Sequence, residues 1–169
     1  ILRRFGMYSE EKTMRSVVPE ELLTEAMKAA DRFGISREAA MRFRPWMLAM
    51  TFTSLQLMQM GIDPEHGVES YLAGRADRMD LPVEGLETLE QQLGFFADMP
   101  PELEIQLLRQ SLDELEIISR MMNTIINAWL TGDDELLEDL LLTTFEDTPE
   151  LYRTLITERN TRWVESILD

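Results

Sequence analysis

The sequence predicts a mainly α-helical fold, a multi-helix bundle with a long central helix and at most a short strand near residues 82–86. Leu, Met, Ala and Glu outnumber the β-branched residues, and the chain has only 8 glycines and 7 prolines, a composition that favours helix. Apolar residues recur every three or four positions along most of the chain, which is the helical period. With 169 residues, of which 44% are apolar, we expect residues 1–169 to form a single helical domain.

The charge is strongly acidic, −16 from 32 acidic and 16 basic residues. Such a surface repels phosphate backbones, so we expect no nucleic-acid partner. Cysteine is absent, which excludes disulfides, thiolate metal sites and cysteine nucleophiles. The stretch that follows Ile1 lacks the charged start, apolar core and cleavage site of a signal peptide. We interpret the chain as a piece of something longer or a processed form, and the compartment stays open.

The first third of the chain predicts an arm followed by helices. Residues 1–18 have no clean period and are expected to form an arm or loop. Pro19 then opens a helix that Gly34 ends. Ser36 is a good N-cap for a second helix, which runs toward Pro45.

Residues 45–60 contain no charged side chain, and apolar residues cover every side of the helix that they predict. A helix that is apolar all round is buried in a protein core or in a membrane. The run is shorter than the roughly 20 residues that cross a bilayer. We therefore expect a central core helix and no transmembrane segment.

The only histidine, His66, follows a helix start at Asp63-Pro64 and lies between Glu65 and Glu69. A single histidine without a second ligand is weak evidence for a metal site, and a surface position is the simpler interpretation. The sequence contains no phosphate-binding glycine loop, nucleophile elbow, zinc-spaced histidine pair or calcium loop.

Residues 81–93 contain the first candidate site residue. Pro82 and Gly85 bracket a short extended piece, and a helix begins directly after it. Glu87 lies near the N-terminus of that helix, where the helix dipole favours a carboxylate. The simpler alternative is a first-turn acid, with Thr88 or Glu87 acting as the cap. Position alone gives a candidate site and no reaction.

The second half predicts one helix over residues 102–130, then a helix capped by Asp133 and a last helix from Pro149. Arg159 and Asn160 lie on or beside the apolar stripe of that last helix. A guanidinium there needs a carboxylate or carbonyl partner, because an unpaired buried charge is very costly. Such a break in the pattern marks either a functional site or a structural salt bridge.

Several motifs together resemble the TraB/GumN family, which is related to the Tiki proteins. Family members often have Asp where this chain has Glu69. The resemblance covers nearly the whole chain, and it rests on the order and spacing of Arg44-Pro45-Trp46, Met60-Gly61-Ile62-Asp63-Pro64 with Gly67-Val68-Glu69, Leu81-Pro82-Val83-Glu84-Gly85-Leu86-Glu87-Thr88 with Gln91-Gln92-Leu93, Trp129 with Gly132-Asp133, and Glu158-Arg159-Asn160 with Trp163.

The resemblance implies a metal-dependent hydrolase or peptidase-like α/β protein, with two Gly-x-x-His motifs on strands before and after this region. His66 is not such a motif, because Asp63 stands three positions before it. Carried over by position, Glu87 is an acidic site residue, and Arg159 and Asn160 are site or site-supporting residues. The divalent metal, which lowers the pKa of bound water, is implied only for the intact protein.

We therefore expect an inactive helical portion of a longer TraB/GumN-like protein, with Glu87 and Arg159 facing one common pocket. Bacterial relatives are often exported, so the resemblance is compatible with a periplasmic or envelope location. The alternative is a protein-binding or regulatory module without catalysis, in which residues 45–60 or 102–130 form a groove for a peptide or protein partner. A homo-oligomer that pairs uncovered apolar faces is the third hypothesis.

Overall fold

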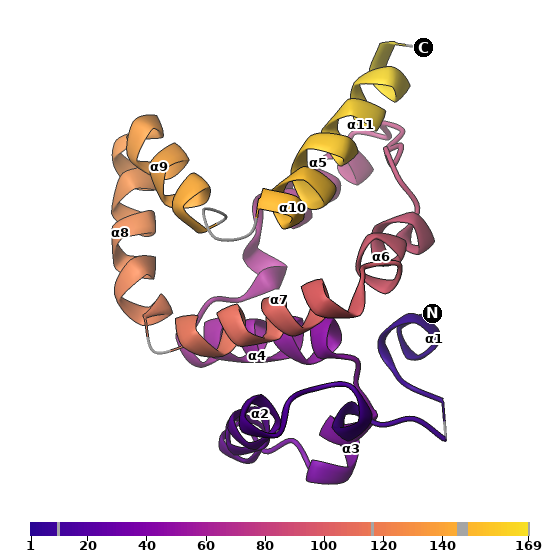
Figure 1. Ribbon diagram of the computed structural model, residues 1–169. Coiled ribbons are helices and arrows are strands. Elements are labelled where there is room, and N and C mark those ends of the chain that lie inside the picture. Colours follow the sequence, from indigo (N-terminus) through magenta and orange to yellow (C-terminus); the bar gives the residue numbers. More distant parts are fainter. Residues whose placement is uncertain (10, 116, 145–148, 169) are drawn as a thin grey trace.

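The computed structural model describes residues 1–9, 11–115, 117–144 and 149–168 of the chain (Figure 1). The mainly α-helical fold is confirmed, since helices dominate these residues. Within them there is no strand, and residues 82–86 belong to no helix or strand. An isolated antiparallel bridge joins Met7 to Phe43.

The helices, in chain order, are α1 (Leu2–Gly6), α2 (Glu20–Arg32), α3 (Arg37–Arg42), α4 (Pro45–Gln59), α5 (Val68–Arg78), α6 (Leu89–Ala97), α7 (Pro101–Glu114), α8 (Ile118–Thr131), α9 (Asp134–Thr144), α10 (Pro149–Tyr152) and α11 (Glu158–Leu168). Short 3-10 turns occupy Met14–Ser16 and Pro64–His66. A π-helical stretch, Arg153–Thr157, joins α10 to α11.

Local capping explains where several helices begin and end. The Ser36 hydroxyl accepts a hydrogen bond from the Ala39 amide at 3.2 Å, and Asp133 accepts one from the Leu136 amide at 3.1 Å. Gly34 and Gly132 adopt φ angles of +73° and +69°, a conformation that closes a helix and that glycine adopts without strain. These helix ends agree with the sequence-based expectation.

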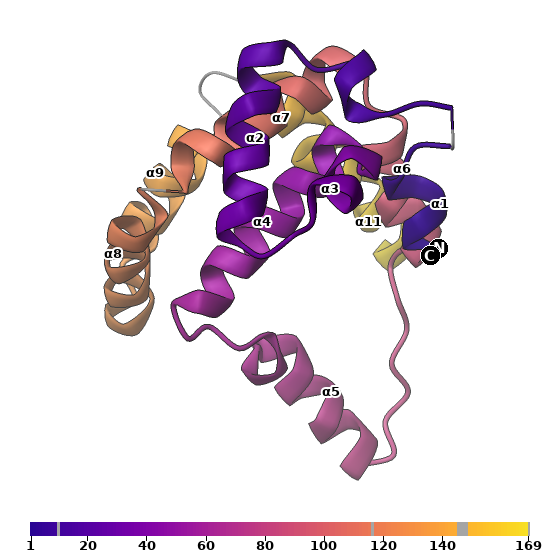
Figure 2. The same ribbon diagram turned by 90° about the horizontal axis from the view of Figure 1, so that it is seen from below.

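The core lies where α2, α4 and α7 meet, and α4 runs along α7 (Figures 1 and 2). Leu22, Phe52 and Leu108 are fully buried there. The first 18 residues, expected to be an arm or loop, contain α1 and a 3-10 turn, and Met14 is completely buried in this core. The N-terminal stretch is therefore packed against the bundle.

The uncharged helix α4 is buried on one side, from Trp46 to Gln56, and exposed on another. Trp46 and Leu48 are at most 2% exposed, whereas Met50 is 43% and Met58 58% exposed. The expectation of burial on every side was therefore too broad, because the described residues leave the side that carries Met50 and Met58 exposed. None of the described helices combines the length and apolarity that a membrane crossing requires.

The single long helix predicted for residues 102–130 is wrong, because α7 and α8 are separate helices that diverge at their junction (Figure 1). The amides of Leu115 and Ile117 bond to the carbonyls of Leu112 and Glu114, three residues back, so the four-residue ladder is interrupted. The apolar stripe continues through the break, yet its two halves have different neighbours. The α7 half packs on α4, and α8 pairs with α9.

A buried ion pair fixes the bundle to the N-terminal stretch. Arg44, the N-cap residue of α4, donates from Nε to Oε2 of Glu104 in α7 at 3.3 Å and from Nη2 to Oε1. Its Nη1 donates to the Phe5 carbonyl of α1 at 3.4 Å. The Glu104 side chain is 5% exposed, so this pair connects three helices within the interior.

Removing the carboxylate of Glu104 is expected to destabilise the fold strongly. Glu104→Gln leaves the Arg44 charge without its counter-charge, which costs about 3 kcal/mol of unfolding free energy. Chemical denaturation measures this cost. The matched control is Asp31→Asn, since the Arg37–Asp31 pair is 66% and 55% exposed and is worth at most about 1 kcal/mol. Equal losses in the two variants would contradict the interior role of Glu104.

Alkaline titration tests the packing around Tyr8. Burial, with a smaller contribution from the Glu104 carboxylate, raises the pKa of Tyr8 from 10.0 to about 12. The folded state then holds the phenol proton more tightly than the unfolded chain does. The resulting stabilisation is complete below pH 10.0 and is lost as the pH rises through about 12. Tyrosinate absorbance of the wild type minus that of Tyr8→Phe should show this late titration; a component centred at the ordinary tyrosine value would overturn it.

Candidate functional site

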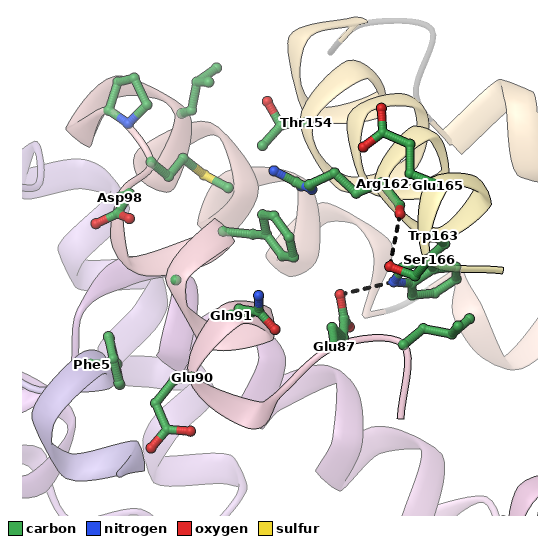
Figure 3. Close-up of a pocket in the computed structure, with 16 residues that line it drawn as sticks. Phe5, Glu87, Glu90, Gln91, Asp98, Thr154, Arg162, Trp163, Glu165 and Ser166 are labelled. Atoms are coloured by element: carbon green, nitrogen blue, oxygen red, sulfur yellow. Dashed lines mark hydrogen bonds between the residues drawn. The ribbon is translucent and has the colours of Figure 1, made fainter. Parts of the chain in front are cut away.

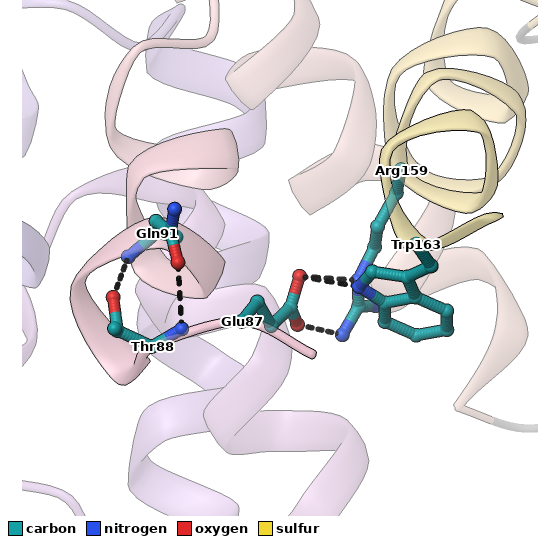
Figure 4. Close-up of polar contacts among 5 residues, drawn as sticks. All are labelled: Glu87, Thr88, Gln91, Arg159 and Trp163. Atoms are coloured by element: carbon teal, nitrogen blue, oxygen red, sulfur yellow. Dashed lines mark hydrogen bonds and ion pairs between the residues drawn. The ribbon is translucent and has the colours of Figure 1, made fainter. Parts of the chain in front are cut away.

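Glu87 stands directly before α6 and does not cap it. Thr88 is the cap: its hydroxyl accepts from the Gln91 amide at 3.2 Å, and its own amide donates to Oε1 of Gln91 at 2.7 Å (Figure 4). This reciprocal capping box satisfies the first turn. The Glu87 side chain is therefore left to point away from α6, toward α11.

Arg159, in the first turn of α11, binds both oxygens of the Glu87 carboxylate. Its Nε donates to Oε2 at 3.0 Å and its Nη2 donates to Oε1 (Figure 4). The two side chains are 25% and 14% exposed, so the pair is partly screened from water. Two parallel charge-assisted hydrogen bonds fix orientation as well as contact. The guanidinium thus has the carboxylate partner that its place beside an apolar stripe requires.

Trp163 completes this arrangement, and sequence reasoning missed it as a site residue. Its Nε1 donates to Oε2 of Glu87 at 3.3 Å, and the Arg159 guanidinium carbon lies 4.5 Å from the centre of its ring. The indole therefore contacts both members of the pair. The available clue was its spacing, since Trp163 follows Arg159 by four residues and such residues share a helix face.

Asn160 is not brought to the same place. It is exposed, and it makes no hydrogen bond to Glu87 in the part of the chain that the structure describes. Successive helical residues point about 100° apart, so Asn160 leaves the face that Arg159 occupies. The structure therefore unites Glu87 with Arg159 and separates both from the side chain of Asn160.

A pocket of about 760 Å³ opens beside the Glu87 carboxylate, between α6 with the turn after it and α11 (Figure 3). Its wall carries four acidic side chains, Glu87, Glu90, Asp98 and Glu165, and one basic side chain, Arg162. Phe5, Phe95 and Trp163 add aromatic surface. Glu87 and Trp163 thus form part of a concave surface that also has room for a ligand.

The hydrogen bonds limit what Glu87 does in this arrangement. A carboxylate has about four acceptor positions, and Arg159 and Trp163 together use three. One acceptor position is left, so Glu87 must release a hydrogen bond before it binds a cation through both oxygens. The arrangement therefore supports an oriented carboxylate and not a free general base.

The described residues do not fit a metal centre. Among them there is no group of three or more His, Cys, Asp and Glu side chains that could hold an ion. The His66 side chain is 84% exposed, and its Nδ1 lies 3.0 Å from Oδ2 of Asp63, consistent with the surface position expected from the sequence.

Replacing Trp163 tests its hydrogen bond to Glu87. Trp163→Phe keeps an aromatic face under Arg159 but removes the indole N–H, and it should cost about 1 kcal/mol of unfolding free energy. Trp129→Phe is the control, because Trp129 is 67% exposed, and it should stay within about 0.5 kcal/mol of the wild type. A Trp163→Phe variant as stable as the control would show that the contact carries no weight in the fold.

Comparisons with known proteins fit the observed motifs. The model of the TraB/PrgY/gumN family matches residues 1–169. The uncharacterized protein YbaP of Escherichia coli (strain K12) is 25% identical over 150 residues, which cover 89% of this chain and 56% of YbaP, and the YbaP of Shigella flexneri matches to the same extent. The chain thus spans about half the length of these curated relatives, and no solved structure matches it. The family match over its whole length shows that this chain belongs to the TraB/PrgY/gumN family.

Proposed function

We propose that this chain is the helical portion of a metal-dependent, peptidase-like hydrolase, that it contributes Glu87 and Arg159 to the site, and that it is inactive by itself. The observation that carries the proposal is the doubly hydrogen-bonded Glu87–Arg159 pair beside a pocket. Strongly paired groups in a cleft are candidates for a functional site. The hydrolytic chemistry itself comes from the family resemblance.

In this proposal Arg159 acts on Glu87. By binding both oxygens it fixes the direction in which the carboxylate points, and Trp163 adds a third contact. An oriented carboxylate needs little reorganisation when a substrate arrives, which is how preorganised sites lower a barrier. Metal ligands would have to include residues other than those that the structure describes, since the described ones do not form a centre. Asn160 has at most a supporting role.

A second candidate, a protein-binding or oligomeric module, is favoured by exposed apolar side chains. On α8, Trp129 and Leu130 are 67% and 75% exposed, and on α5, Tyr71 is 61% exposed. The α8–α9 hairpin and α5 both project from the bundle (Figures 1 and 2). Large exposed apolar patches mark interaction sites. Native mass and binding of an apolar dye separate the candidates, because a compact monomer without dye binding argues against this module.

Peptide hydrolysis by a longer form of the protein, assayed with and without a chelator, tests the proposed hydrolase. We expect chelator-sensitive activity in that form, and a drop of about 100-fold in kcat/KM for Glu87→Gln, the size of effect seen when a positioned acid or base is lost. The 169-residue chain should be inactive and should bind zinc weakly in calorimetric titration. Glu135→Gln, an exposed change on α9, is the control and should keep full activity.

Hydrolysis or tight zinc binding by the 169-residue chain would contradict its proposed inactivity. Unchanged kcat/KM in Glu87→Gln would remove Glu87 from the site.

A further inference from the structure

We propose that the pocket beside Glu87 binds a positively charged side chain, lysine or arginine, of a peptide. This deepens the proposed function by naming a feature of the substrate. It is tested by equilibrium binding, so its failure is distinguishable from a failure of the hydrolase proposal. The argument rests on the size of the pocket, its charges, its aromatic surfaces and a glycine in its wall.

The size suits a peptide side chain with part of its backbone. At about 760 Å³, the pocket lies within the range of roughly 300–1,000 Å³ that small-molecule sites occupy. The pocket lies between α6 and α11, and residues of both helices line it (Figure 3).

The charges of the wall favour a cation. Glu87 is neutralised by Arg159, but Glu90, Asp98 and Glu165 form no ion pair among the residues that the structure describes. Arg162 is the one basic side chain on the described wall. Three uncompensated carboxylates against one guanidinium leave a negative field, and a concave surface concentrates that field.

The aromatic surfaces already hold cations that belong to the chain. The Arg162 guanidinium carbon lies 4.5 Å from the centre of the Phe95 ring, and no described carboxylate pairs with it. Cations are attracted to the face of an aromatic ring. Arg162 thus stands in for a ligand, since it is an exposed side chain that an incoming lysine or arginine can replace on the face of Phe95.

Gly94 keeps the wall of the pocket open between two of the carboxylates. Glu90, Gly94 and Asp98 follow one another at four-residue intervals, so they share a face of α6. Glycine inside a helix is less stable than alanine. A methyl group at Gly94 would meet only Oδ2 of Asp98, at an ordinary 3.8 Å. Packing within the described chain therefore does not require glycine at position 94. We attribute the glycine to a ligand that occupies the space between the two carboxylates.

Fluorescence anisotropy of a labelled peptide is the direct test. The probe is a neutral alanine peptide with one central arginine, and the comparison peptide has glutamine in its place. We expect the arginine peptide to bind about tenfold more tightly, from one aromatic contact and the carboxylates. Its affinity should fall as salt is raised, because exposed charges are screened. Free acetyl-arginine amide, as a competitor, shows whether the side chain alone suffices.

Four variants locate the binding. Glu90→Gln with Asp98→Asn should weaken the arginine peptide about fivefold, whereas Glu135→Gln with Glu138→Gln, which removes the same charge from exposed positions on α9, should not change it. Gly94→Leu should abolish binding without lowering the melting temperature, because leucine favours helix. Arg162→Gln should strengthen binding about threefold, since it removes the competing cation.

Equal affinity for the arginine and glutamine peptides would overturn the proposal. So would equal losses in the α6 and α9 double variants, which would reduce the effect to net charge. Binding that survives Gly94→Leu, or that weakens in Arg162→Gln, would place the cation elsewhere.

Discussion

One carboxylate, Glu87, makes the polar contacts that orient the C-terminal helix α11. No residue of α11 is buried, so apolar packing gives this helix little reason to stay where it is. Its main contacts to the rest of the bundle are instead the hydrogen bonds that Arg159 and Trp163 donate to Glu87. Those contacts join residues that lie far apart in the chain, and they form one side of the pocket. We therefore expect the shape of the pocket to depend on the contacts of Glu87.

The chain contains two doubly hydrogen-bonded arginine–carboxylate pairs, and their surroundings differ. Arg44–Glu104 lies in the interior, with Glu104 5% exposed, whereas Arg159–Glu87 borders a pocket, with Glu87 14% exposed. The interior pair connects three helices, and the pocket beside it is smaller, about 340 Å³ against about 760 Å³ beside Glu87. The second pair meets solvent and a concave wall, so a ligand can reach it. This difference is why we assign structure to the first and function to the second.

Local chemistry explains which features could be predicted from the sequence. Caps such as Ser36 and Thr88 act within a few residues, so their patterns predicted helix starts. The break between α7 and α8 was missed because the apolar stripe runs on unchanged, and only tertiary neighbours make it bend. From the sequence, Glu87 was identified by its place before a helix and Arg159 by its place beside an apolar stripe. The structure brings the two side chains together. Trp163 was identified only as part of a motif of the family resemblance, since an indole on an apolar stripe gives no sign of its polar contact.

A double-mutant cycle of Glu87→Gln and Arg159→Gln tests the central claim most directly. A hydrogen bond to a charged group contributes about 1.5–3 kcal/mol to stability. The cycle isolates the interaction between the two side chains, and we expect a coupling of about 2 kcal/mol in unfolding free energy. Both single variants should also expose Trp163, seen as a red shift of its fluorescence, as α11 leaves α6. A coupling near zero, with Trp163 unchanged in every variant, would show that the two side chains do not hold the helix or shape the pocket.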